Sequence, residues 1–153
     1  MPKVDPLKVV RSILVPVDGS DASYGALATV CDIARNTKAS VAALHVIEVP
    51  RAQALDADLP AEAERGEAVL ERAEQVAGDH KVKVRGELLQ ARHAGPAIVD
   101  EASAGRMDAI AMGLGPSGPY GRFQLDETAQ YVLEHAPCDV WLFRYASDER
   151  PVP

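Results

Sequence analysis

The sequence predicts an α/β fold: a single-domain, Rossmann-like sheet of five parallel strands with helices on both faces. Five short apolar runs alternate along the chain with four stretches of helical periodicity. Such alternation is typical of a parallel sheet with right-handed crossovers. Aromatic residues make up only 5% of the 153 residues, so we expect a core of Val, Ile, Leu and Ala that lets helices approach the sheet closely.

The first strand and the first helix are expected near the N-terminus. Ser12–Val17 is a nearly continuous apolar run, which suits a strand buried on both faces. A turn follows, in which Ser20 or Asp21 can cap a helix. The apolar stripe of that helix has the spacing i, i+3, i+4 and i+7 and consists of Leu27, Val30, Cys31 and Ala34.

Two further strands flank the second helix. Val41–Val49 is an apolar run rich in Val and Ala, and the loop Pro50–Pro60 follows it. A helix is predicted over Ala61–Asp79, with Glu and Arg residues forming its solvated face. Val82–Leu89 alternates less cleanly and is interpreted as the third strand.

The remaining elements keep the same order. A short helix is predicted over His93–Gly105, with Gly105 as its C-terminal stop. Strand four is predicted at Asp108–Met112 and the last helix at Thr128–Ala136. Pro137 ends that helix, and Cys138–Phe143 is the fifth strand.

The bulk numbers describe one domain, residues 1–145, and a polar tail, 146–153, that we expect to be disordered. The chain has 16 Lys and Arg against 23 Asp and Glu, a net charge of −7, without a basic block. This composition argues against nucleic acid and against a membrane surface as partners. No apolar segment has the length of a membrane span, and residues 1–10 lack the apolar region of a secretory signal. We therefore expect a cytoplasmic protein.

The two cysteines, Cys31 and Cys138, lie far apart and in no metal-ligand spacing. They are expected to be buried, reduced thiols that behave as small apolar residues. The sequence therefore predicts no metal site.

The segment Met112–Gly121 is the most informative part of the chain. It holds four glycines after an apolar strand and before a helix. That arrangement can present backbone N–H groups and a helix N-terminus to a phosphate. However, Asp126 and Glu127 stand just before the helix, where two carboxylates would repel a phosphate at close range. The segment is either a working phosphate cradle, the remnant of one, or a connection without a ligand.

Three segments in this order resemble the universal stress protein family. They are Ile13–Ser20 with the sequence ILVPVDGS, Leu44–Ile47, and Met112-Gly113 together with Val132–Cys138. The resemblance runs from about Arg11 to Arg144. It implies a five-stranded parallel sheet. Many members of this family are small cytoplasmic proteins that are linked to stress responses, and they are often dimeric through the last strand. In the nucleotide-binding branch, the resemblance implies that Asp18 and main chain near Val46 hold adenosine while the glycine-rich loop wraps the phosphates.

The resemblance carries over residue by residue only in part. The candidate nucleotide-binding residues are Pro16, Val17, Asp18, Val46, Gly113, Gly115, Ser117 and Gly118. Without gaps, Pro116 replaces the second glycine of the loop, and Asp126 and Glu127 replace its final glycine and hydroxyl residue. A one-residue shift places Gly115, Ser117 and Gly118 on the loop and Leu125 and Asp126 on the final pair. In either register the phosphate-facing pair is absent, and proline also removes an N–H donor.

Two single residues have alternative interpretations. Asp18 either holds a ribose or caps the first helix. His45 lies inside an apolar run, and we expect a structural histidine whose ring is hydrogen-bonded.

The fifth strand predicts an assembly. Its residues Val140, Trp141, Leu142 and Phe143 are too apolar for a free sheet edge, where unpaired backbone groups invite another strand. We therefore expect a homodimer through this strand.

Taken together, these features predict a regulatory or interaction protein with a degenerate ATP-binding loop. We expect it to require no cofactor and to have a protein partner that the sequence does not identify. The alternative is a sensor that binds ATP or AMP through Asp18, Val46 and the Gly113–Gly121 loop. No nucleophile–base pair is visible, so no catalytic residue and no enzyme activity are predicted, although low-level nucleotide hydrolysis stays compatible with the sequence. An enzyme of the wider adenosine-binding group is the third and least supported class.

Overall fold

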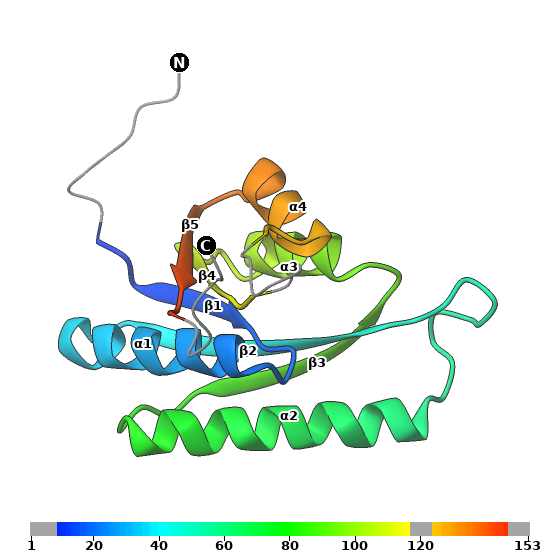
Figure 1. Cartoon of the computed structure of the whole chain (residues 1–153), viewed down its shortest axis with the longest axis horizontal. Coiled ribbons are helices and arrows are strands. Elements are labelled where there is room, and N and C mark those ends of the chain that lie inside the picture. The colour runs from blue at the N-terminus through cyan, green and yellow to red at the C-terminus, as the bar shows by residue number, and fades with distance from the viewer. Residues whose placement is uncertain (1–8, 117–123, 147–153) are drawn as a thin grey trace, which may run out of the picture.

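The computed structural model describes residues 9–116 and 124–146 (Figure 1). Strands and helices alternate as the sequence predicts, which confirms the α/β class. The elements are β1 (Ser12–Pro16), α1 (Asp21–Thr37), β2 (Ser40–Glu48), α2 (Pro60–Asp79), β3 (Arg85–Ala91), α3 (Ala94–Ala104), β4 (Ala109–Leu114), α4 (Glu127–His135) and β5 (Asp139–Arg144). The predicted disordered tail lies outside the described residues apart from Ala146.

The five strands form one parallel sheet in the order β3-β2-β1-β4-β5. The chain adds β2 and β3 on one side of β1, and then crosses over to place β4 and β5 on the other side. Ile13 of β1 consequently pairs with both Val41 and Ala109. The carboxyl ends of β1 and β4 thus form the topological switch point, where open α/β sheets bind ligands.

Helices cover both faces of the sheet, as predicted. Figure 1 shows α1 and α2 on the lower side and α3 and α4 on the upper side. Buried residues of the lower layer, such as Leu27 and Ala73, pack with Ile13 and Val15 of β1. On the upper side Ile98 and Val132 pack with Leu14 and Ile110. The core is built of Val, Ile, Leu and Ala, with Cys31 and Met112 as the exceptions.

All five strands differ slightly in their bounds from the prediction, and β3 and β4 differ most, for a physical reason. Val82 and Val84 pack into the lower core before any pairing begins, because the ladder between β2 and β3 starts only at Ala42 and Arg85. The apolar residues at the start of this segment thus indicate which side chains are buried, but they do not indicate where the backbone hydrogen bonds of the strand begin. Strand β4, in contrast, continues beyond Met112, since Gly113 pairs with Phe143. Gly113 therefore lies in a strand and not in the loop where the sequence placed it.

The cysteines are both free, but only Cys31 is buried, whereas Cys138 is half-buried. The prediction of two buried thiols was thus wrong for Cys138, which lies directly before the edge strand β5. Burial, and secondarily the nearby Asp32 carboxylate, raise the pKa of the Cys31 thiol to about 11. Among the described residues, no helix combines the length and the apolar character needed to span a bilayer.

Candidate functional site

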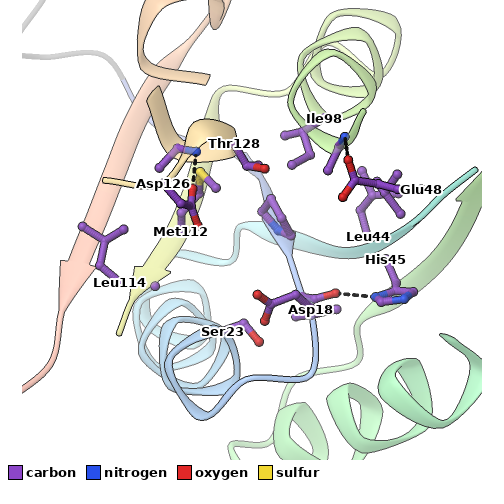
Figure 2. Close-up of a pocket in the computed structure, with 16 residues that line it drawn as sticks. Asp18, Ser23, Leu44, His45, Glu48, Ile98, Met112, Leu114, Asp126 and Thr128 are labelled. Atoms are coloured by element: carbon purple, nitrogen blue, oxygen red, sulfur yellow. Dashed lines mark hydrogen bonds between the residues drawn. The ribbon is translucent and has the colours of Figure 1, made fainter. Parts of the chain in front are cut away.

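A cavity of about 200 Å³ opens at the carboxyl ends of β1, β2 and β4, at the topological switch point (Figure 2). Its walls come from both halves of the chain. One wall belongs to β1, β2 and α1, and the other belongs to α3, β4 and α4. The lining residues are Pro16, Val17, Asp18, Ser23, Leu44, His45, Val46, Glu48, Ala94, Ile98, Met112, Gly113, Leu114, Asp126, Thr128 and Ala129.

Five of the predicted site residues lie together in this lining: Pro16, Val17, Asp18, Val46 and Gly113. Gly115 and Pro116 line an adjoining hollow, which shares Asp18, Gly113 and Asp126 with the cavity. Ser117 and Gly118 lie outside the described residues. The structure thus brings the candidate adenosine-holding residues together.

Asp18 sits at the end of β1 and acts on helix α1 through Ser20. Its Oδ1 accepts hydrogen bonds from the backbone N–H of Ser20 at 2.9 Å and from Ser20 Oγ at 2.6 Å. Ser20 is the N-cap, and its Oγ accepts the N–H of Ser23. Asp18 therefore orients the cap and is not the cap itself, which corrects the interpretation of this residue as the helix cap. The interpretation that it holds a ribose stays a prediction.

The hydrogen bonds also keep the Asp18 carboxyl ionised. Burial alone raises its pKa, but the hydrogen bonds from the side chain and backbone of Ser20 outweigh burial and hold the pKa below the ordinary value of 3.8. A negative charge consequently lies in the cavity at neutral pH. A carboxylate in this state is a strong acceptor for a ligand hydroxyl.

Asp126 is the N-cap of α4, and its Oδ1 accepts the N–H of Ala129 at 2.7 Å. This cap moves the start of the helix one residue ahead of the predicted Thr128. The neighbouring carboxylate of Glu127 lies in a different hollow, which is formed with His93 and Tyr131. Asp126 therefore faces the cavity as predicted, whereas Glu127 does not line it.

Glu48 is a cavity residue that the sequence analysis missed. It is the last residue of β2, and its Oε2 accepts the N–H of Ala94 at 3.3 Å, at the N-terminus of α3. A carboxylate at the end of an apolar run was the signal available in the sequence. Figure 2 shows Glu48 and Asp126 entering from opposite sides, each with its dashed bond to a helix N-terminus.

Two further polar side chains of the cavity, those of His45 and Ser23, are held by hydrogen bonds to backbone carbonyls. His45 Nδ1 donates to the carbonyl oxygen of Val17 at 2.8 Å, which fits the predicted structural role of this histidine. Ser23 Oγ donates to the carbonyl oxygen of Ser20 at 2.8 Å. Within residues 9–116 and 124–146, no group of three His, Cys, Asp or Glu side chains is arranged to hold a metal ion.

Gly113 is needed for packing as well as being a candidate ligand contact. A Cβ atom at this position would overlap the carbonyl oxygen of Ala22 in the first turn of α1. Only glycine lets α1 approach the end of β4 in this way.

The predicted dimer residues lie on β5, an edge strand of the described sheet. Trp141 and Phe143 pack against the lower core with α1, while Val140 and Leu142 pack against the upper core. These side chains are therefore half-buried within one chain. In the described sheet no strand follows β5 on its outer side, and the homodimer stays a prediction.

Comparison with known proteins agrees with the fold and with the sequence motifs. The family model described as "Universal stress protein family" matches residues 10–144. A universal stress protein of Methanocaldococcus jannaschii is 29% identical over 145 residues, which cover 91% of this chain and 85% of that protein. The solved universal stress protein of Archaeoglobus fulgidus has a TM-score of 0.72 at 22% identity, covering 86% of this chain and 97% of that one. A universal stress protein family member from Arabidopsis thaliana, solved with AMP bound, has a TM-score of 0.65 at 20% identity, covering 92% and 96%.

Proposed function

The chain belongs to the universal stress protein family, and we propose that it acts as a regulatory or interaction protein that does not hold ATP tightly. The position of Asp126 carries this proposal. Its carboxylate caps α4 at the cavity, and the family resemblance implies that the loop leading into this helix faces the phosphates. A triphosphate placed there would meet a fixed negative charge in place of a free helix N-terminus.

The adenosine part of a ligand is the part that the cavity suits. Asp18 offers its carboxylate to a ribose hydroxyl, and Pro16, Val17 and Val46 supply apolar wall. The proposal includes no catalytic step, since no hydrogen bond pairs the Ser23 hydroxyl with the His45 ring as nucleophile and base, and each donates to a backbone carbonyl instead. A cytoplasmic location and an unidentified protein partner belong to the same proposal.

A sensor of ATP or AMP is the second candidate. It is favoured by the convergence of Asp18, Val46 and Gly113 in one cavity and by the relative from Arabidopsis thaliana with AMP bound. AMP carries less charge than ATP, so Asp126 opposes AMP less. This makes AMP the stronger of the two sensor ligands.

The nucleotide content of the purified protein tests the proposal. The full chain is denatured, and the released small molecules are analysed by mass spectrometry. A second sample of the native protein is then titrated with millimolar ATP in a calorimeter. We expect neither released ATP nor binding heat. ATP recovered in stoichiometric amount would instead make the sensor the leading function.

A further inference from the structure

The charge of the cavity points to the class of ligand. Its lining contains three carboxylates, Asp18, Glu48 and Asp126, and no Lys or Arg from the described part of the chain. Phosphate groups in proteins are usually held by Lys, Arg or open helix N-termini. None of the described lining residues offers the first two.

Two of the helix N-termini at the cavity, those of α3 and α4, already have anionic partners from the chain itself. Asp126 accepts the N–H of Ala129 at the start of α4, and Glu48 accepts that of Ala94 at the start of α3. The positive ends of both helix dipoles thus have a carboxylate beside them. A phosphate would have to displace these side chains or lie against them.

The same carboxylates suit a ligand rich in hydrogen-bond donors. A carboxylate has about four acceptor sites, so one backbone N–H leaves capacity on Glu48 and on Asp126. Hydroxyl and amino groups can donate hydrogen bonds to carboxylates, and because they carry no negative charge they are not repelled by them. A nucleoside carries such donors around an apolar ring, and the floor of the cavity is apolar at Leu44 and Ile98.

We propose that the ligand of this cavity is an uncharged nucleoside, and that Glu48 and Asp126 reject the 5′-phosphate of the corresponding nucleotide. This inference rests on the adenosine-holding cavity of the proposed function. Asp126 is the main discriminating residue. Only Asp18 and Asp126 among the three carboxylates also line the adjoining hollow, and Asp18 is the one assigned to the ribose hydroxyl.

Calorimetry of the full chain with adenosine and with AMP tests the inference. We expect adenosine to bind about tenfold more tightly than AMP at low salt. Repulsion between the AMP phosphate and one nearby carboxylate, at an intermediate dielectric constant, would give at least this ratio. Added salt should improve AMP binding and leave adenosine binding unchanged, since only the phosphate is repelled.

Three variants locate the effect. Asp126→Asn keeps a good N-cap for α4 and removes the charge, so the ratio of AMP affinity to adenosine affinity should rise by about tenfold. Glu127→Gln is the matched control, because it removes one negative charge at the neighbouring residue, which does not line the cavity. This variant should change the AMP affinity much less. Glu48→Gln should shift the ratio in the same direction as Asp126→Asn but by less, because Glu48 lies on the opposite side of the cavity.

The outcomes separate the two proposals. AMP binding as tightly as adenosine to the wild-type chain, or equal effects of Asp126→Asn and Glu127→Gln, would overturn the nucleoside inference alone. Binding of neither compound at millimolar concentration would overturn the adenosine-holding cavity itself.

Discussion

Gly113 of β4 touches Ala22 of α1 so closely that a Cβ atom on Gly113 would overlap the Ala22 carbonyl oxygen. The two residues are far apart in the chain, and their contact fixes how the first helix meets the end of the fourth strand. Both elements contribute walls to the cavity. A change at Gly113 therefore affects stability and the shape of the cavity together.

Gly113→Ala should lower the free energy of unfolding by about 1–3 kcal/mol, the usual effect of an added methyl group in a packed site. Urea unfolding measures it. Gly78→Ala is the control, because nothing lies within 4 Å of a Cβ at Gly78 in α2, and that variant should gain about 0.4–1 kcal/mol. Equal effects of the two changes would contradict the close approach.

Asp18→Asn should make the fold less stable at neutral pH. The pKa of Asp18 in the folded chain lies below 3.8, its value in the unfolded chain. The ionised carboxylate therefore contributes fully to stability above pH 3.8, and this contribution is lost as the pH falls through the pKa of the folded state. The difference between wild type and variant in urea unfolding should therefore shrink below pH 3.8. Asp58→Asn, in the exposed loop before α2, controls for net charge. A constant difference at all pH values would disprove the assignment.

Val140→Pro should convert a dimer into a monomer. Asp139 donates its N–H to Asp108, and alternate residues of a strand direct their N–H groups to opposite edges, so the N–H of Val140 points outward. Proline is tolerated on a strand edge but cannot donate a hydrogen bond there. Val140→Ala loses the same packing and keeps the donor. Light scattering should find Val140→Ala dimeric; a monomeric wild type would end the dimer proposal.

Arg92→Ala should open the loop between β2 and α2. The Arg92 Nη1 group donates to the carbonyl oxygens of Pro50 at 2.7 Å and Gln53 at 2.8 Å. Limited digestion with trypsin should therefore cut after Arg51 faster in this variant than in wild type. Arg65→Ala, on the exposed face of α2 with Glu62 as its ion partner, should leave that cut unchanged. Similar rates in both variants would show that Arg92 does not hold the loop.

The order of the elements and the parallel sheet could be predicted because the buried strands are nearly continuous apolar runs. The ends of strands were less predictable, since Val82 and Val84 pack into the core without pairing. Side chains at the carboxyl edge were harder still. The bond from Ala94 to Glu48 depends on how α3 meets the end of β2 in three dimensions, and spacing along the chain does not encode this. The N-cap bond of Asp126 is different, because it reaches Ala129 only three residues on, and Asp is a preferred N-cap residue.

The cavity walls come from two stretches of the chain that meet only in the folded state, residues 16–48 and 94–129. A molecule that fills the cavity therefore fastens one half of the chain to the other, and its binding adds to the free energy of unfolding by mass action. At a hundred times the dissociation constant, this addition is about 2.7 kcal/mol, which raises the melting temperature of a chain of this size by roughly 5–10 °C. A melting-temperature screen across a metabolite library would thus find the natural occupant without any assay of biological activity.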